Sequence, residues 1–259
     1  MIFPERNRVV YEVNVLEEVK SQICFPPILK IDSSPPVELQ ESLRAEFPFF
    51  DTTMSMKIPM GIPQPVFNLV EGHGGGKKAY QFTTENKLSV LALSKDEISL
   101  TSRDYDRWET FRTRIVNSLK LTSDVYSPSF FTHTCLRYKN AIRRSQVGLE
   151  GVDWAELVEP WVGGIFSQLG VANKNDAYLS RCKFRVEESD NWIEAVFALA
   201  THQPTQEQAF VIETHVFNDS KKEVKNVVDQ LDSLHRLAGN FFRWCITKKL
   251  HGAMRPKPV

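Results

Sequence analysis

The sequence predicts an α+β fold, in which helices pack on an antiparallel sheet. Segments in which apolar and polar residues alternate are typical of half-buried strands, and several of them follow one another with only turns between them. Amphipathic helical segments come after these groups of strands, whereas a parallel βαβ sheet would place a helix between successive strands. The longest helical segment, Ser220–His251, lies near the end of the chain.

The same order of elements occurs twice along the 259 residues. Each time a strand is followed by a helix, an antiparallel meander and a second helix, and the corresponding parts lie roughly 115 residues apart. We therefore expect a single body made of two related halves, residues 1–125 and residues 126–259. The first half contains a loop rich in Gly and Pro at residues 50–79, and the second half ends in the long helix at 220–251.

In the first half, Val9–Phe25 alternates apolar and polar residues and is expected to be one strand, which Pro26 and Pro27 end. A short helix then begins after Ser34 and ends at Pro48. The other elements expected in this half are the loop at 50–79, strands at Lys87–Leu93 and Glu97–Thr101, and a helix with Asp106 near its start.

In the second half, Asp153 and Glu156 have the spacing of a helix cap. Pro160, a few residues further on, either kinks this helix or marks its true start. The strands expected in this half are Phe130–Ile142, Tyr178–Glu187, Trp192–Thr201 and Gln208–Phe217.

The segment Ser220–His251 is expected to be one helix about 45 Å long, because an α-helix rises 1.5 Å per residue. Ser220 and Glu223 have the spacing of a capping box, and Gly252 follows as a helix stop. Its apolar residues recur at helical spacing: Val224, Val227, Val228, Leu231, Leu234, Ala238, Phe241, Phe242 and Cys245. The adjacent apolar pairs widen this face. Core packing explains such a width, and a cavity for a hydrophobic ligand between helix and sheet is the alternative.

The composition is that of a folded protein with no overall charge. The chain carries 32 basic and 32 acidic residues, so its surface as a whole is not expected to attract nucleic acid or anionic lipid. No apolar run follows the N-terminal charges as in a signal peptide, and no uncharged stretch approaches the roughly 20 apolar residues of a membrane helix. Four scattered cysteines are expected to be reduced thiols in or near the core. We therefore expect a soluble, cytoplasmic protein.

Two motifs in the glycine-rich segment resemble catalytic loops but lack the residues that their chemistry needs. His73–Gly76 matches the HGGG loop that supplies oxyanion-hole amides in some esterases, yet the sequence contains no G-x-S-x-G elbow for a nucleophile. Gly76-Lys77-Lys78 imitates part of a phosphate-binding loop, but Lys78-Ala79 offers no hydroxyl for magnesium. We expect an ordinary loop here and no catalytic residues.

The spacing of the histidines and cysteines along the sequence does not indicate a metal site. The six histidines form no H-x-x-x-H or H-E-x-x-H pair, and no two cysteines have C-x-x-C spacing. His133 and Cys135 share one face of a strand, and His215 could join them from a neighbouring strand. We expect these residues to be structural, and we expect no metal and no cofactor.

Positive charge on two strands is the main candidate for a binding site. One face of Phe130–Ile142 carries Arg137 and Lys139, and one face of Tyr178–Glu187 carries Arg181, Lys183 and Arg185. If these strands are neighbours, the cations line one sheet face and can hold a phosphate, a carboxylate or an acidic protein surface. The alternative is that Glu194 and Glu213, on the adjoining strands, neutralise them internally.

Three segments together resemble a sporadically distributed bacterial family, known mainly as an uncharacterised sequence profile. They are the opening Gln22–Ile31 (QICFPPILKI) with Pro36, Leu39–Glu41, Arg44 and Phe47–Pro48 after it, the central strand Leu136–Ile142 (LRYKNAI, against the family's LRYxNxI) and the helix start Tyr105–Phe111. The resemblance spans nearly the whole chain and implies a shared fold, but it implies no reaction and no catalytic residues. The family's patchy distribution suggests mobile or defence-linked genes.

Three classes of function fit these observations. The first is a non-enzymatic sensor or adaptor, in the context of a bacterial antiphage defence system. It would bind a protein partner, one candidate being an effector encoded nearby. The second is a protein that binds a hydrophobic ligand or lipid between the sheet and the C-terminal helix. The third is an enzyme whose site is assembled from distant residues. We rank the first class highest, and we do not expect nucleic acid as a partner.

Overall fold

The computed structural model describes residues 3–55, 77–164, 178–187, 189–203 and 205–259. It combines helices with a large antiparallel sheet, so the α+β prediction is confirmed at this level. The chain divides into two compact units. The first unit comprises Met1–Glu17, Leu136–Phe217 and Asp232–Val259, and the second unit comprises Glu18–Cys135 and Asn218–Leu231.

These units are not the same division as the predicted halves, 1–125 and 126–259. The N-terminal segment Met1–Glu17 belongs to the unit that contains the end of the chain. One reason is that β1 (Val9–Tyr11) pairs with β11 (Pro256–Pro258) in a two-stranded antiparallel sheet. That the two halves are related in structure stays a prediction.

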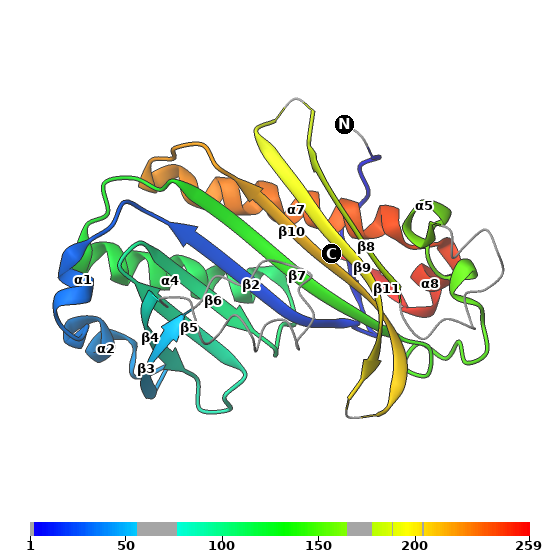
Figure 1. The fold of residues 1–259 in the computed structure, drawn as a ribbon, viewed down its shortest axis with the longest axis horizontal. Coiled ribbons are helices and arrows are strands. Elements are labelled where there is room, and N and C mark those ends of the chain that lie inside the picture. Colours follow the sequence, from blue (N-terminus) through cyan, green and yellow to red (C-terminus); the bar gives the residue numbers. More distant parts are fainter. Residues whose placement is uncertain (1–2, 56–76, 165–177, 188, 204) are drawn as a thin grey trace. The chain divides into compact units, whose positions relative to one another are not determined.

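In the second unit, five strands lie side by side in the order β3-β4-β5-β6-β2 (Figure 1). Each strand runs antiparallel to its neighbours. Their bounds are Leu16–Cys24 for β2, Phe49–Ser55 for β3, Lys77–Thr83 for β4, Ser89–Ser94 for β5 and Glu97–Ser102 for β6. Each of these pairings joins strands of the same compact unit, and β3 is the outer strand of the group.

The second unit contains α1 (Leu29–Ser33), α2 (Val37–Leu43) and α4 (Trp108–Tyr126), together with the start of the C-terminal helical region. Helix α4 contacts β6 and α2, and it buries the predicted apolar face that includes Phe111 and Ile115. The prediction of a helix that starts near Asp106 is therefore confirmed.

The first unit contains the second group of strands, in the order β7-β10-β9-β8. The prediction of strands in these four places is confirmed. Their bounds are His133–Arg143 for β7, Tyr178–Arg185 for β8, Asn191–His202 for β9 and Glu207–Asn218 for β10. Strand β7 contributes residues to this unit from Leu136 onward.

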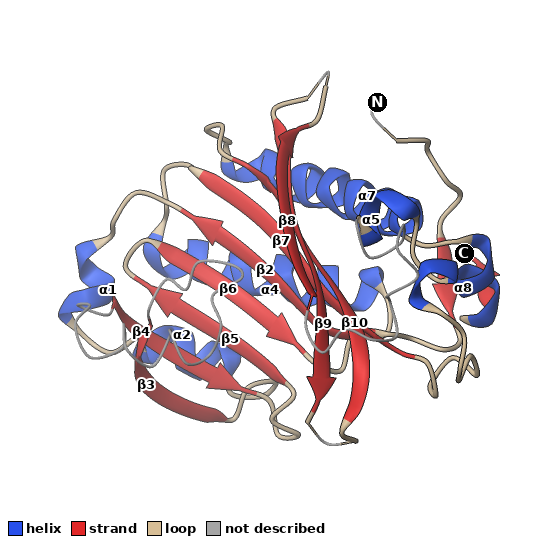
Figure 2. Cartoon of the chain, turned by 45° about the vertical axis from the view of Figure 1, so that its right-hand side comes forward, coloured by secondary structure: helices blue, strands red, loops and turns tan. Residues whose placement is uncertain are grey.

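The C-terminal helix α7 (Val227–Cys245) covers one face of these strands (Figure 2). Phe241 is fully buried, and its ring lies 6.0 Å from that of Phe184 on β8 and 6.5 Å from that of Phe197 on β9. On β7, the Tyr138 hydroxyl lies 2.9 Å from Nδ1 of His235 on the helix. These contacts identify the face of each strand that points to α7, and hence the opposite face, which carries the candidate site.

The prediction of one helix from Ser220 to His251 is wrong at both ends. Ser220 does not cap the helix, because its hydroxyl donates to Oδ1 of Asn218, and α7 starts only after the short 3₁₀ helix η2 (Val224–Asn226). At the other end, Ile246 forms a β-bridge with Val158, which interrupts the helix. The chain then continues as α8 (Lys248–Ala253). At 1.5 Å per residue, α7 is about 28 Å long.

Three other predictions need correction. The segment Val9–Phe25 is two strands, since Asn14 between them accepts a hydrogen bond from the Leu16 amide at 3.0 Å. The predicted loop at 50–79 is strand at its two ends, in β3 and β4, while residues 56–76 lie outside the described residues. The helix expected after Asp153 is a short 3₁₀ helix, η1 (Trp154–Glu156), followed by α5 (Pro160–Gly163), so the proline marks a true start.

Within the described ranges, the structure contains no helix that is long and apolar enough to cross a membrane.

Truncation of Leu231 tests the apolar face of α7. This leucine is fully buried, so Leu231→Ala removes buried methyl groups, leaves a cavity and is expected to lower the free energy of unfolding by about 2–5 kcal/mol. Urea unfolding followed by circular dichroism measures it. The matched control is Leu29→Ala, at an exposed helical position, with an expected change within about 0.5 kcal/mol. Equal effects of the two substitutions would contradict the assigned core.

Candidate functional site

Strand β8 has one apolar face and one basic face. The side chains of Cys182 and Phe184 lie on the face toward α7 and are half-buried, whereas Arg181, Lys183 and Arg185 alternate with them and are exposed. The antiparallel register with β9 places Lys183 opposite Glu194. We call Arg181, Lys183 and Arg185 the β8 cation row. The predicted alternation is therefore confirmed from Tyr178 to Arg185, where the strand ends two residues earlier than predicted.

Each member of the β8 cation row has a partner in the first unit. Arg181 Nη2 donates to Glu194 Oε1, and Arg185 Nη2 donates to Asp190 Oδ1. The Lys183 ammonium lies 5.3 Å from the centre of the Trp192 ring and 5.2 Å from that of another aromatic ring, Phe217. A cation above an aromatic face is attracted to it without losing all of its hydration.

The two cations predicted on β7 also have carboxylate partners. Arg137 Nε lies 2.6 Å from Glu213 Oε1, in ion-pair contact but without the alignment of a hydrogen bond. Lys139 Nζ lies 3.2 Å from an oxygen of Glu17. Their side chains are 38% and 39% exposed, although Nε of Arg137 itself is buried. Whether Arg137 and Lys139 bind an anion stays a prediction.

The two groups of cations do not lie on neighbouring strands. Strands β10 and β9 lie between β7 and β8, which at about 4.8 Å per strand separates the groups by about 14 Å. The predicted condition for one continuous patch, that the two strands adjoin, is therefore not met. The β8 cation row is the group that lies on an outer strand, since β8 is the last strand in the order.

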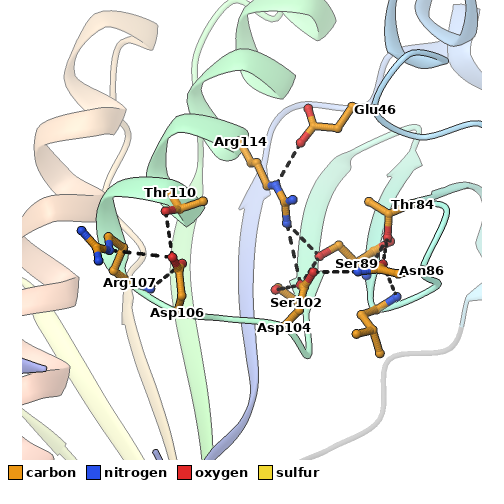
Figure 3. Close-up of polar contacts among 11 residues, drawn as sticks. Glu46, Thr84, Asn86, Ser89, Ser102, Asp104, Asp106, Arg107, Thr110 and Arg114 are labelled. Carbon is orange, nitrogen blue, oxygen red and sulfur yellow. Dashed lines mark hydrogen bonds and ion pairs between the residues drawn. The ribbon is translucent and has the colours of Figure 1, made fainter. Parts of the chain in front are cut away.

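A second polar cluster surrounds Asp104, and sequence analysis missed it (Figure 3). Asp104 Oδ1 accepts hydrogen bonds from Ser102 Oγ at 2.7 Å and from Ser89 Oγ at 2.8 Å. Asp104 Oδ2 accepts one from Asn86 Nδ2 at 3.1 Å. The guanidinium of Arg114 on α4 lies 3.7 Å from Oδ1. The cluster thereby joins the β4–β5 turn to the link between β6 and α4.

The hydrogen bonds lower the pKa of Asp104. Partial burial alone would raise this pKa, but the bonds from Ser102, Ser89 and Asn86 and the charge of Arg114 outweigh it and lower the pKa from 3.8 to about 2. A carboxylate with so low a pKa is a poor general base at neutral pH. We therefore interpret the cluster as a structural connection. The sequence signal that could have found it is Asn86 two residues after Thr84, which is typical of a side-chain-stabilised turn.

The other candidates from the sequence form no site within either unit. The HGGG segment, His73–Gly76, lies outside the described residues. His133 and Cys135 belong to the second unit and His215 to the first. Within the second unit, His133 Nδ1 lies 2.6 Å from Oδ1 of Asp219.

No protein-family model matches the chain, and a comparison with curated proteins found no match either. The resemblance to the bacterial family therefore stays a prediction.

The two arginines of the β8 cation row are expected to differ in their effect on stability. The side chain of Glu194, the partner of Arg181, is only 11% exposed, whereas Asp190, the partner of Arg185, is 63% exposed. Arg181→Gln leaves a carboxylate with little access to water and is expected to lower the free energy of unfolding by about 1–3 kcal/mol. Arg185→Gln serves as the matched control, with an expected change within about 0.5 kcal/mol. Similar losses in urea unfolding would argue against this difference.

The Asp104 cluster predicts a pH dependence of stability. The pKa of Asp104 is lower in the folded state, so its stabilisation is complete above the unfolded pKa of 3.8 and is lost as the pH falls toward 2. We expect Asp104→Asn to be less stable than the wild type at pH 7, and the difference to shrink by about 1 kcal/mol at pH 3, after allowance for solvent screening. Urea unfolding at both pH values measures it. Asp124→Asn, at an exposed position on α4, is the control; a difference that does not change with pH would contradict the assignment.

Proposed function

We propose that the chain is a non-enzymatic adaptor or sensor that binds an extended, acidic segment of a protein partner along strand β8. The observation that carries the proposal is the β8 cation row, three positive side chains at alternate positions on the last strand of the sheet order.

An edge strand offers backbone groups to a partner. Among the described residues, β8 pairs with β9 alone, through the register from Tyr178↔Leu199 to Arg185↔Trp192. The backbone amides and carbonyls on the other side of an edge strand can bond to an added strand, which supplies affinity, while side chains at alternate positions supply specificity. An extended peptide therefore fits this edge better than a folded surface.

The charges on β8 favour an acidic peptide. Arg181 and Arg185 are paired with Glu194 and Asp190, whereas the contacts described for the Lys183 ammonium are with aromatic rings. The side chains of Arg181 and Arg185 are 50% and 59% exposed, and each guanidinium has five N–H donors, more than one carboxylate can use. Glu or Asp at alternate positions of an added strand would lie opposite the row, where pairs of opposite charge are favourable.

Antiphage defence is the biological setting that we propose for this adaptor, and it comes from the resemblance alone. Genes adjoining the one that encodes this chain test it, since an effector encoded nearby would be a candidate partner. Acidic alternation in an exposed segment of that effector would link the setting to β8.

The peptide-binding prediction uses a double substitution, Lys183→Gln with Arg185→Gln. It spares Arg181, whose partner Glu194 is buried. The probe is a labelled peptide with glutamate alternating with threonine, and its binding is followed by fluorescence anisotropy. Two lost charge pairs of about 0.7 kcal/mol each should weaken binding about tenfold. Binding should also weaken between 0.01 M and 0.15 M salt, as the screening length falls from about 30 Å to about 8 Å.

The matched control also removes one lysine and one arginine charge, at positions outside β8. Arg44→Gln with Lys225→Gln changes exposed residues that are paired with Glu41 and Glu223, and it should leave peptide binding unchanged. A second control peptide has glutamine in place of glutamate. Equal binding by the two double variants, or equal binding of the two peptides, would sink the proposal.

A further inference from the structure

Strand β3 forms the end of the sheet in the second unit and carries exposed apolar side chains. Among the described residues its only strand partner is β4, along the whole register from Phe49↔Thr83 to Ser55↔Lys77 (Figure 2). Phe49 is 48% exposed, Phe50 43% and Met54 66%. A hydrophobic edge strand is a site where another strand can pair.

One face of β3 continues the apolar core of the second unit. The Phe50 ring lies 5.4 Å from that of Phe82 and 6.1 Å from that of Tyr80, and both of these β4 side chains are almost completely buried. Met54 lies on the same face of β3 as Phe50, four residues along. The buried apolar side chains of β4 are therefore followed, on the same face of the sheet, by exposed apolar side chains of β3. A further strand beside β3 would extend this apolar face.

The sequence of β3 is complementary to itself in an antiparallel pair. If two copies pair about Thr52, Phe50 of each copy lies opposite Met54 of the other, and Asp51 lies opposite Thr53. Sulfur and aromatic rings attract each other, and opposed threonines can hydrogen-bond. No residue described on this strand places like charges directly opposite in this register. A two-fold pair of this kind closes after two copies.

Strand β8, the last strand in the sheet order, differs from β3 in its charges. If β8 paired with itself about Lys183, that lysine would face its own copy and Arg181 would face Arg185. Like charges directly opposite are destabilising, and cations are a common protection of natural sheet edges. Strand β3 contains no lysine, arginine or proline. Its charge pattern therefore permits self-pairing, whereas that of β8 opposes it.

We propose that the chain forms a homodimer by antiparallel pairing of β3 with β3 of a second copy, about a two-fold axis at Thr52. The pairing replaces one local bond, in which Asp51 Oδ1 accepts from the Thr52 amide at 2.7 Å. In exchange it pairs the backbone of both edges and covers Phe50 and Met54 of each copy. This inference does not rest on the partner site at β8.

The experiment uses charges placed on the proposed axis. Thr52 is exposed and lies opposite its own copy, so Thr52→Lys and Thr52→Glu each place like charges in contact. Sedimentation velocity of the full chain, from about 1 to about 200 µM, covers the range of a weak to moderate dimer. We expect the wild type to dimerise with increasing concentration and each variant alone to sediment as a monomer. A mixture of the two variants in equal amounts should dimerise again, because Lys then faces Glu.

Two controls keep the result interpretable. Thr201→Lys introduces the same charge at an exposed position of β9 and should leave dimerisation unchanged. Thermal unfolding followed by circular dichroism checks that both Thr52 variants are folded. Variants that fold and recover dimerisation only when mixed would support the proposal, because a general loss of structure cannot be restored by mixing.

Four outcomes would overturn the proposal. The first is a wild type that stays monomeric over the whole concentration range. The second is a dimer that Thr52→Lys does not weaken, which would place the interface elsewhere. The third is the absence of dimer in the mixture of variants, which would exclude a two-fold axis at Thr52. Oligomers larger than a dimer also count against it, because edge pairing of this kind closes at two copies.

Discussion

The burial of Phe241 determines which faces of β8 and β9 point into the core of the first unit. Helix α7 places this side chain against Phe184 of β8 and Phe197 of β9, where it has no contact with water. Successive side chains of a strand point to opposite faces, so the packing of the half-buried Phe184 against Phe241 places Lys183 and Arg185 on the other face. A shift of one residue in register would bury these cations and expose the phenylalanine. The basic face of β8 is therefore a consequence of the apolar packing behind it.

The same alternation acts in the second unit, with a different result at the edge. Tyr80 and Phe82 of β4 are buried, and the next strand repeats the apolar pattern with Phe50 and Met54, which remain exposed. Most edge strands limit the cost of such exposure with charges or proline. In β3 the one charged residue is Asp51. The core of this unit thus ends at exposed apolar side chains, and exposed apolar surface on an edge strand is where another strand can bind.

Local sequence patterns correctly predicted the strands and helices that have a single apolar face. Alternation was sufficient for Tyr178–Glu187 and helical spacing for the helix at Trp108, because each has one apolar face. Elements that depend on distant partners were missed. Strand β3 follows Pro48 with little alternation and is a strand through its pairing with β4, and α7 ends where Val158 bridges to Ile246. For the site, alternation predicted the outward cations of β8, but the order of the strands and the contacts within the Asp104 cluster are not contained in any local pattern.

The burial of each carboxylate partner decides which cations remain available to a second protein. Glu194 is buried, so its carboxylate has little hydration and depends on Arg181 as its partner. The ion pair therefore holds the Arg181 guanidinium in place. Asp190 is exposed, and Arg185 can exchange it for another carboxylate at little cost. Lys183 rests above the rings of Trp192 and another aromatic side chain, and this attraction persists when an anion approaches from the open side. A formal net charge of zero conceals this difference. We therefore expect the proposed acidic segment to gain most affinity at Lys183 and Arg185.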